Sequence, residues 1–546
     1  MLADDWWKHG IVYQIYPRSF QDSNADGIGD LDGIATRLDY LQGLGVDAIW
    51  ISPIYPSPMA DFGYDVADYC DVDPMFGTLV DFEALMADAH ARGLKVILDY
   101  VPNHTSDQHP WFQLSRSARD NPKRDWYLWR DPAADGGPPN NWLSNFGGPA
   151  WTFDEATGQY YSHSFLKQQP DLNWRKADVR AAMYEVMRFW LRRGVDGFRI
   201  DVLYHVLKDA KFRDNPPNPN WQPGDESSHR VLPVRTTDLP EMQQIVREMR
   251  QVTDEFSTPQ SSRILIGELY LPIERLVRYY GCNDGNTDGV LSGVQLPFNF
   301  HLIGAPWQAE AIGQLVQQYE AALPAGAAPN WVLGNHDKPR IASRVGADNA
   351  RLAAMLLLTL RGTPTLYYGD EIGMQDVEIA PDEVQDPFEK NEPGKGLGRD
   401  PERTPMQWTP AAPHAGFTQG TPWLRLADDW RDRNVERQDA MPTSMLTLYR
   451  ALIALRRAQA PLNRGDYERI EHEGLPADVL AYARSYEGRR LVVLLNFSEG
   501  MQTVGADRLP AGSTVLVSTH AVREEATIGI SIDLRAFEGV VVGPRG

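Results

Sequence analysis

The sequence predicts an α/β protein built on a (β/α)8 TIM barrel, with an inserted domain after strand 3 and a C-terminal antiparallel β-sandwich. Three observations lead to this fold class. Eight short apolar segments recur, helical stretches separate most of them, and strand-like runs fill the chain after residue 465. An open doubly wound sheet remains the alternative, because the number of strands does not prove closure.

Each apolar segment has the length of a strand and ends in Gly, Pro, Asp, Asn or Glu. In chain order the segments are IVYQIYP from 11, DAIWISP from 47, KVILDYVPNH from 95, VDGFRIDV from 195, ILIGELY from 264, GVLSGVQLP from 289, NWVLGNHD from 330 and TPTLYYGDE from 363. The stretches between them place apolar residues at helical spacing, as in LDGIATRLDYLQGLG, DFEALMADAHARG, RAAMYEVMRFWLRRG and ARLAAMLLLTLRG.

The interval between Lys95 and Asp196 is far longer than one barrel unit needs, and it contains the run DPAADGGPPNNWLSNFGGPAW. We therefore expect an inserted domain B at 104–173, so that 1–103 and 174–464 form the catalytic barrel. Long loops are expected from 213 and from 376 to about 405. Runs such as VLAYARSY and RLVVLLNFS predict that 465–546 form the C-terminal sandwich.

The formal net charge of −21 over 546 residues argues against nucleic acid and membranes as partners, because both are polyanionic. It favours a neutral or cationic small ligand. Cys70 and Cys282 are the two cysteines, too few for a disulfide framework or a thiolate metal site, so two reduced thiols are expected. The N-terminal MLADDWWKHG lacks the pattern of a secretory signal, and a cytoplasmic location is expected. The oligomeric state stays open.

Three acidic residues stand where apolar segments end: Asp201 in GFRIDV, Glu268 in ILIGELY and Asp337 in WVLGNHD. In a strand, Arg199 lies on the same face as Asp201 and would keep it ionised as a nucleophile; a structural ion pair is the alternative. Glu268 has no basic neighbour in sequence, so an apolar setting would raise its pKa and make it a general acid; a carboxylate facing solvent is the alternative. One ionised and one protonated carboxyl group are what a retaining glycosidase requires.

Further polar and aromatic side chains lie near the strand ends. Asp337 follows His336, and His104 closes the third segment. Such groups can bind sugar hydroxyls, while metal binding by the histidines is an alternative that no HxxxH or HxH spacing supports. Tyr64 could stack on a sugar face with Asp61 beside it, although an ordinary packed tyrosine is equally compatible with the sequence.

The run DSNADGIGD has the alternating oxygen donors of the first part of an EF-hand loop, with Gly27 at its sixth place. It departs from that pattern at the twelfth place, where Gly33 stands instead of Glu. We expect one structural Ca²⁺ or Mg²⁺ and no cofactor for catalysis; a metal-free capped turn before a helix at Leu31 is the alternative. The expected metal ligands are Asp22, Asn24, Asp26, the carbonyl of Ile28, and Asp30.

The motifs together resemble the α-amylase family of glycoside hydrolases. DYVPNH, GFRID, GE and NHD occur in the family's order along the whole predicted barrel. QPDLN at 169–173 is similar to a marker of the α-glucosidase and oligo-1,6-glucosidase branch. GIVYQIYPRSF, DFGYDVADY and RTPMQW resemble the same branch.

This resemblance implies a retaining double displacement, with Asp201 as nucleophile, Glu268 as acid/base and Asp337 as transition-state stabiliser. Asp61 with Arg399 would cap the non-reducing end of the sugar and enforce exo action. The full set of implied substrate-binding residues is Asp61, Tyr64, His104, Phe165, Arg199, His336 and Arg399, with Asp99 as structural support. The implied activity is an exo-acting α-glucosidase on short α-glucosides of the maltose, isomaltose or sucrose type, with transglucosylation to hydroxyl acceptors.

Two sequence features point in different directions on the preferred linkage. Val202, next to the predicted nucleophile, resembles enzymes that accept α-1,6 linkages, whereas the long loop from 213 resembles maltose-acting and glucosyl-transferring relatives. Tyr204 precedes His205 where starch-cutting amylases commonly have a Lys-His pair. Three alternatives remain: a trehalose synthase or sucrose isomerase of the same fold, a metal-dependent barrel hydrolase, and a non-catalytic barrel partner protein.

Overall fold

Eight parallel strands close into a barrel in the computed structural model, which describes residues 5–281, 290–411, 413–471, 474–520 and 528–544. The strand order around the barrel is β1-β11-β10-β9-β8-β7-β3-β2, so each strand pairs with its neighbour in sequence among the barrel strands. Closure excludes the open doubly wound sheet. The strands are β1 (Val12–Ile15), β2 (Ala48–Ile51), β3 (Lys95–Tyr100), β7 (Gly197–Ile200), β8 (Ile264–Gly267), β9 (Leu296–Asn299), β10 (Asn330–Val332) and β11 (Thr363–Tyr367).

The sixth barrel strand begins later than the sequence predicts. Within the predicted segment GVLSGVQLP, residues 290–295 form no strand, and β9 starts at Leu296. Gly289 lies outside the described residues. Gly293 explains part of the difference, because a Cβ there would lie 2.0 Å from the Tyr279 carbonyl oxygen, so the chain makes a close backbone contact before the strand begins.

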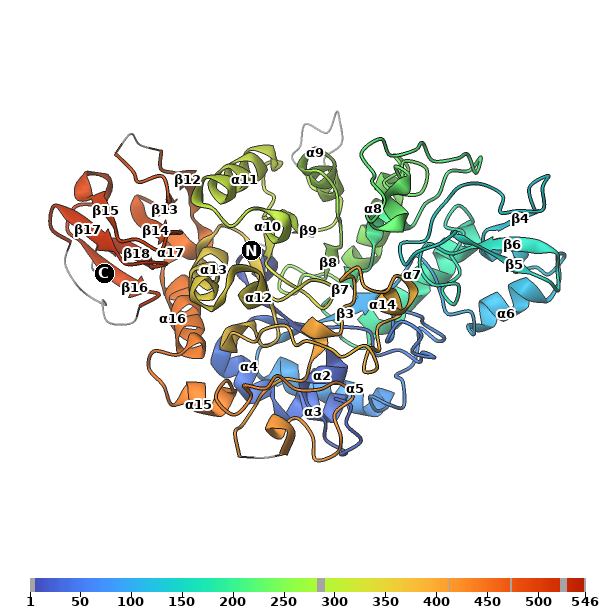
Figure 1. Cartoon of the computed structure of the whole chain (residues 1–546), viewed down its shortest axis with the longest axis horizontal. Coiled ribbons are helices and arrows are strands. Elements are labelled where there is room, and N and C mark those ends of the chain that lie inside the picture. Colours follow the sequence, from blue (N-terminus) through green and yellow to red (C-terminus); the bar gives the residue numbers. More distant parts are fainter. Residues whose placement is uncertain (1–4, 282–289, 412, 472–473, 521–527, 545–546) are drawn as a thin grey trace.

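Helices surround the barrel and bury apolar faces against it (Figure 1). The helix α5 begins in a capping box, in which Thr78 and Asp81 satisfy each other's backbone N–H groups. The helices outside the inserted segment are α1 (Trp6–His9), α2 (Pro17–Phe20), α3 (Leu31–Thr36), α4 (Leu38–Leu44), α5 (Leu79–Ala91), α7 (Ala177–Arg192), α8 (Met242–Asp254), α9 (Ile273–Leu276), α10 (His301–Gly304), α11 (Ala309–Ala322), α12 (Ile341–Val345), α13 (Ala347–Thr359), α14 (Pro387–Asn391), α15 (Val435–Asp439), α16 (Met445–Ala458) and α17 (Ala460–Arg464).

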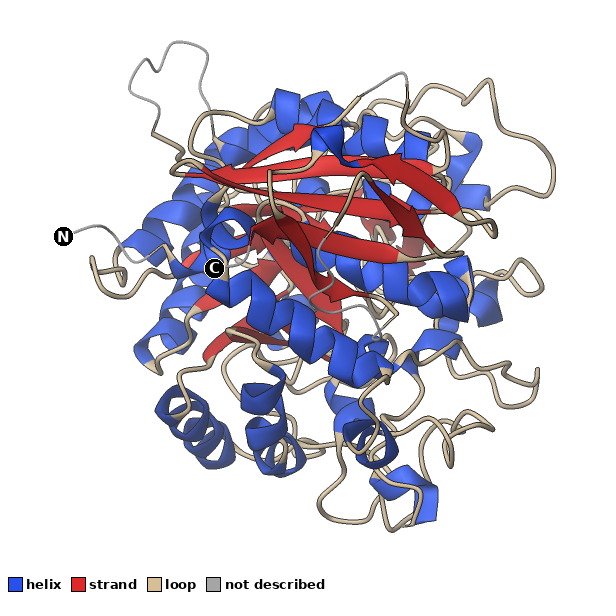
Figure 2. Cartoon of the chain, turned by 90° about the vertical axis from the view of Figure 1, so that its left-hand side faces the viewer, coloured by secondary structure: helices blue, strands red, loops and turns tan. Residues whose placement is uncertain are grey.

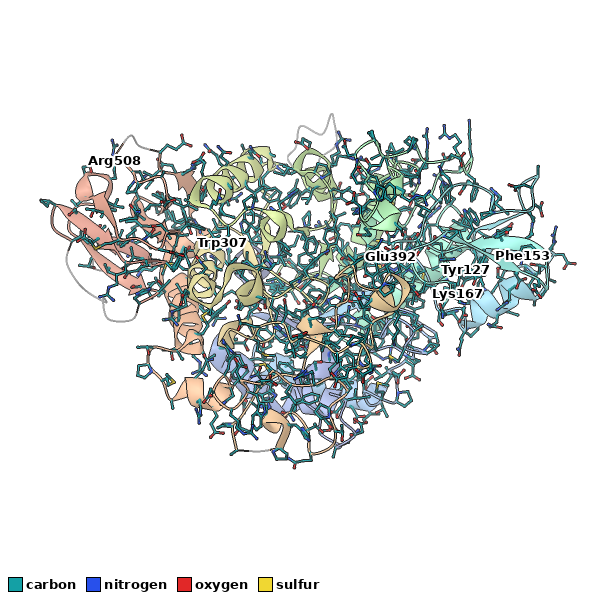
Figure 3. The ribbon with its side chains drawn as sticks, in the orientation of Figure 1. Tyr127, Phe153, Lys167, Trp307, Glu392 and Arg508 are labelled. Atoms are coloured by element: carbon teal, nitrogen blue, oxygen red, sulfur yellow. The ribbon has the colours of Figure 1, made fainter. Side chains whose placement is uncertain are left out.

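Between β3 and α7 the chain forms a small lobe at the right of Figure 1. The lobe contains α6 (Pro110–Ser117) and a three-stranded sheet of order β4-β6-β5, made of β4 (Trp129–Arg130), β5 (Trp151–Asp154) and β6 (Gln159–Ser162). Phe112, Tyr127 and Trp129 pack its interior, with Phe112 and Tyr127 in an edge contact at 5.0 Å between ring centroids. Tyr127 and Phe153 are labelled in this lobe in Figure 3. The bounds of this lobe as a domain stay a prediction.

The C-terminal strands form two antiparallel sheets, and the larger one faces the viewer in Figure 2. Its order is β12-β13-β14-β18-β16, and β15 pairs with β17 in the smaller sheet. Along β13 the side chains alternate: Val479 and Ala481 enter the core between the sheets, while Leu480 and Tyr482 join the core against the barrel helices. The strands are β12 (Asp466–Arg469), β13 (Val479–Tyr486), β14 (Arg489–Asn496), β15 (Gln502–Gly505), β16 (Ser513–Ser518), β17 (Ser531–Leu534) and β18 (Gly539–Pro544).

The structure also bears on the predicted reduced thiols and on membrane-spanning segments. Cys70 is half-buried and free, and burial raises the pKa of its thiol to about 11, which makes it unreactive. Cys282 lies outside the described residues. In the part of the chain that the structure describes, no helix combines the length and the apolar character needed to cross a membrane.

Candidate active site

Strand register brings the predicted acids together at the carboxyl end of the barrel. Asp99 on β3 pairs with Arg199 on β7, and Arg199 pairs with Ile266 on β8. Asp201 and Glu268 each lie two residues beyond these partners and therefore point to the same face at the same level. The barrel geometry thus explains why residues far apart in sequence form one cluster.

Arg199 contacts three carboxyl groups, one more than the sequence indicated. Its Nη1 lies 2.8 Å from Asp99 Oδ1 and 2.9 Å from Asp201 Oδ1, and its Nη2 lies 2.7 Å from Glu268 Oε2. All four side chains are buried. Glu268 has no basic neighbour in sequence, but the Arg199 guanidinium reaches it across the β7–β8 pair, so its setting is not purely apolar.

One buried guanidinium does not balance three carboxylates. Burial raises the pKa of Asp201, of Glu268 and of Asp99, and the charge of Arg199 only partly opposes these shifts. The expectation that Arg199 holds the pKa of Asp201 low is wrong for the same reason. Three buried carboxyl groups therefore share one guanidinium, which favours protonated over ionised carboxyl groups in this cluster.

The backbone after Asp201 turns sharply and holds Glu268 in place. Val202 has φ 35° and ψ 46°, a left-handed conformation that a β-branched residue adopts only under strain. In this conformation its N–H donates to Glu268 Oε2 at 2.8 Å. A short 3-10 helix, η2 (Leu203–His205), follows. The strained turn therefore fixes the positions of both predicted catalytic carboxyl groups.

Asp337 sits in a different electrostatic environment, with two arginines on one oxygen. Arg403 Nη2 lies 2.7 Å and Arg399 Nη1 3.2 Å from Asp337 Oδ1. Burial alone would raise the pKa of Asp337, but His336, Arg399 and Arg403 together hold it far below its usual range. The pKa of Asp337 is thus lowered, whereas the pKa values of the carboxyl groups around Arg199 are raised.

Arg399 links Asp337 to two further carboxyl groups, those of Asp61 and Asp386. Its Nη2 lies 2.7 Å from Asp61 Oδ1 and 2.6 Å from Asp386 Oδ1, and its own backbone N–H donates to Asp386 Oδ2 at 2.8 Å. Sequence reasoning found the Asp61–Arg399 pair but missed Asp386 and Arg403. Arg403 follows Arg399 in GRDPERTPMQW, so its position in the same motif was a usable signal, whereas nothing in the sequence around Asp386 pointed to it.

Tyr64 and His336 form a stacked, hydrogen-bonded pair in the wall of the site. Their rings lie 5.3 Å apart at 2°, and Tyr64 Oη is 2.7 Å from His336 Nε2. The Gln14 side-chain amide donates to His336 Nδ1 at 2.7 Å, so Nε2 carries the proton and donates to Tyr64. The Tyr64 hydroxyl then donates to Asp99 Oδ2 at 3.1 Å, which connects this wall to the Arg199 cluster.

His104 and the motif QPDLN meet at the base of the inserted lobe. Gln169 Nε2 donates to Asp61 Oδ2 at 3.0 Å and lies 3.2 Å from His104 Nε2, so the first residue of the motif joins two predicted sugar-binding side chains. Asp171 accepts from Asn103 at 2.9 Å, and Lys208 Nζ lies 3.5 Å from its other oxygen. This buried cation was missed by sequence reasoning.

One cavity of about 500 Å³ is lined by most of the predicted site residues: Asp61, Tyr64, His104, Phe165, Asp201, Glu268, Asp337 and Arg399. The predicted residues Asp99, Arg199 and His336 lie behind its wall. Phe165 forms part of its wall and packs against His104 at 5.3 Å between ring centroids. Side chains from the two long loops complete the cavity. Residues that lie on its wall and were not predicted are Asn145, Phe146, Tyr204, Glu226, His229, Tyr270, Lys338, Phe388, Leu397 and Glu402.

The predicted metal loop folds as a series of side-chain turns. Asp22 Oδ1 accepts the N–H of Asn24 at 2.8 Å, Asn24 accepts that of Asp26 at 2.9 Å, and Asp26 accepts that of Ile28 at 2.8 Å. Asp30 caps helix α3 through the N–H of Gly33 at 2.7 Å, and Gly27 takes φ 90°. In the described ranges no group of three or more His, Cys, Asp or Glu side chains is placed to hold a metal ion.

The fold and the paired carboxyl groups at the strand ends define a glycoside hydrolase site. The family description "Alpha amylase, catalytic domain" matches residues 14–465, and the chain belongs to the α-amylase family. It is 42% identical to a probable α-glucosidase of Rhizobium meliloti (strain 1021), over 91% of this chain and 90% of that protein. It is 39% identical to an oligo-1,6-glucosidase of Halalkalibacterium halodurans, over 99% of each chain.

Solved structures agree with the sequence relatives. An α-glucosyl transfer enzyme superposes with a TM-score of 0.90 at 39% identity, covering 99% of both chains. The trehalulose synthase MutB of Pseudomonas mesoacidophila MX-45 superposes with a TM-score of 0.87 at 35% identity, covering 98% of this chain and 99% of that chain. The resemblance stated from the sequence motifs and the fold class are thereby confirmed.

Proposed function

We propose that the protein is a retaining, exo-acting α-glucosidase that releases glucose from the non-reducing end of short α-glucosides and transfers part of it to other hydroxyl acceptors. The observation that carries the proposal is the contrast between two buried carboxyl environments. Asp201 and Glu268 share one guanidinium and burial raises the pKa of both, whereas His336 and two arginines lower the pKa of Asp337 against its burial. Relatives named α-glucosidase and oligo-1,6-glucosidase support the substrate class.

The proposed mechanism assigns one role to each carboxyl group. Glu268 carries the cluster's proton and gives it to the leaving oxygen, while ionised Asp201 attacks the anomeric carbon. Glu268 then takes a proton from the attacking water or acceptor hydroxyl, which breaks the glucosyl–Asp201 bond. Asp337 stabilises the positive charge that develops on the sugar ring in both steps.

The ion pairs beside Asp337 support exo action. Asp61, Arg399 and Asp386 form a buried ion-pair chain there, and Phe146 lies under the Arg399 guanidinium at 4.9 Å. We propose that this chain blocks the site beyond the terminal glucose unit, so that a polysaccharide could not pass through it. Proton NMR of the first product tests retention, because α-glucose should appear before its mutarotation to the β-anomer.

A glucosyl-transferring isomerase is the second candidate, and the similarity to the α-glucosyl transfer enzyme and to the trehalulose synthase favours it. The same carboxyl groups would act, but water would be excluded from the glucosyl-enzyme. Product analysis with maltose, isomaltose, sucrose, trehalose and maltotriose distinguishes the two. The hydrolase proposal predicts free glucose, and rearranged disaccharide without glucose would overturn it. The panel also determines the preferred linkage.

We further propose a structural divalent cation in the loop from Asp22 to Asp30, on the basis of the EF-hand-like alternation of oxygen side chains in its sequence. The ligands would be the side chains of Asp22, Asn24, Asp26 and Asp30 with the carbonyl of Ile28. Metal analysis of the purified protein tests this proposal. A cytoplasmic location stays a prediction from the sequence, and cell fractionation tests it.

A further inference from the structure

A second cavity of about 680 Å³ lies directly behind the substrate cavity. The two cavities have Pro339, Gly396, Gly398 and Glu402 in common, so a thin wall separates them. Val377, Ile379 and Val384 form apolar parts of the second cavity, which we call the rear chamber. Its size lies in the range of about 300 to 1,000 Å³ that small-molecule sites occupy in proteins.

Residues 394–398 form the wall, and we call this five-residue segment the strap. Hydrogen bonds and an ion pair hold it on both sides. Glu389, which lines the rear chamber, accepts the N–H of Gly394 at 2.7 Å and of Gly398 at 3.2 Å. Lys395 Nζ lies 2.8 Å from Glu392 Oε2 and donates to the Asp225 carbonyl at 2.9 Å. Figure 3 labels Glu392, which is near α14 in the middle of the molecule. The strap runs directly into Arg399, so its position is coupled to the substrate cavity.

Glu402 gives the wall a polar group that faces both cavities. It is 2% exposed, and its own backbone N–H donates to its carboxyl group. A carboxyl group can make more than one hydrogen bond, and ligand hydroxyls can supply further partners. Burial also raises the pKa of Glu402, which keeps it neutral and able to donate.

We propose that the rear chamber is a second binding site for a monosaccharide-sized neutral polyol, with glucose as its ligand, and that its occupancy acts on the substrate cavity through the strap and Arg399. Apolar side chains beside carboxyl groups suit a pyranose, which has an apolar face and a hydroxylated rim. The identity of the sugar rests on the proposed function, since glucose is the product released next to this wall.

Equilibrium dialysis with radiolabelled glucose tests the proposal. The wild-type chain should bind two glucose molecules, and Ile379→Trp, which fills the rear chamber without touching the substrate cavity, should bind one and keep hydrolysing substrate. Val384→Trp provides a second filling variant. Val80→Trp is the matched control, because Val80 is 72% exposed on α5 and lines neither cavity; it should bind two.

The outcomes separate this inference from the proposed function. If the wild-type chain binds one glucose molecule, and this binding is lost in Tyr64→Ala but kept in Ile379→Trp, the rear-chamber site is overturned and the proposed function is left intact. Two bound molecules in Ile379→Trp and Val384→Trp would also overturn it. A third outcome would support the rear chamber and refute the proposed function: bound glucose is lost in Ile379→Trp and kept in Tyr64→Ala, and the wild-type protein hydrolyses no α-glucoside.

Discussion

Replacement of Arg399 by alanine tests the electrostatic division of the site. The change removes ion pairs at 2.7 Å to Asp61, 2.6 Å to Asp386 and 3.2 Å to Asp337. Removing one partner from a buried ion pair costs about 3 to 5 kcal/mol, so the free energy of unfolding should fall by roughly that amount. Urea titration measures it, with the slope expected to stay unchanged.

The same substitution should lower activity. Asp61 and Asp337, the two carboxyl groups that the proposed function places against the sugar, each lose a charge-assisted hydrogen bond worth about 1.5 to 3 kcal/mol. At about 1.36 kcal/mol per factor of ten, kcat/KM should fall by roughly 10²- to 10⁴-fold. The assay is initial rates on an aryl α-glucoside and on maltose, at a temperature where circular dichroism shows the variant folded.

Arg399→Ala should also change how activity and stability depend on pH, in a direction that follows from the pKa of Asp337. Burial raises the pKa of Asp337, and the nearby positive charges lower it further than burial raises it. Loss of Arg399 therefore raises the folded-state pKa of Asp337. A depressed carboxyl pKa contributes stability that is lost as pH falls through it, so the acid limbs of activity and of stability should both move to higher pH.

A surface control completes this test. Arg437 is half exposed and contacts Asp432, and such an ion pair is worth about 0 to 1 kcal/mol, so Arg437→Ala should change neither property appreciably. If Arg399→Ala kept kcat/KM within about threefold of wild type and the acid limb did not move, the assignment of Arg399 to Asp61 and Asp337 would be refuted.

Three further predictions concern other parts of the molecule. Asp201→Asn should reduce kcat by more than about 10³-fold without loss of stability, because it removes one of three carboxyl groups from a single guanidinium; kinetics and urea titration check both. Lys208→Met should destabilise the fold by about 3 to 5 kcal/mol, because it leaves buried Asp171 without its cation; an unchanged urea midpoint would contradict this. A chelator should lower the melting temperature and leave the rate at 25 °C nearly unchanged, whereas immediate loss of activity would favour the metal-dependent hydrolase.

The barrel could be predicted because each strand signal is local. Seven of the eight predicted segments contain a strand at the expected place, since short apolar runs that end in a turn residue are typical of buried strands. The segment from 289 overlaps its strand only at its end, because β9 starts at Leu296; the contact of Gly293 with the Tyr279 backbone, which depends on tertiary structure, explains part of this difference. The C-terminal sandwich was predictable for the same local reason, as the alternation along β13 shows.

The sequence predicted which acidic residues form the candidate site, but it did not predict how their charges are balanced. Asp201, Glu268 and Asp337 were found because each stands at a strand end, and the structure brings all three to one cavity. The third partner of Arg199 could not be found, because it depends on the pairing of β7 with β8 and not on sequence distance. Asp386 was missed for a similar reason. Its importance comes from its ion pair with Arg399, and the strap separates these two residues in the sequence.

The charges of the two carboxyl environments fit the proposed division of roles between an acid and a stabiliser. Arg199 faces Asp99, Asp201 and Glu268, so that cluster has more carboxyl groups than cations, and burial raises the pKa of all three. Asp337 has two arginines on a single oxygen, and together with His336 they lower its pKa against its burial. In the proposed mechanism the proton for the leaving oxygen therefore comes from the Arg199 cluster, while the charge on the ring is met by the carboxyl group whose pKa is lowered.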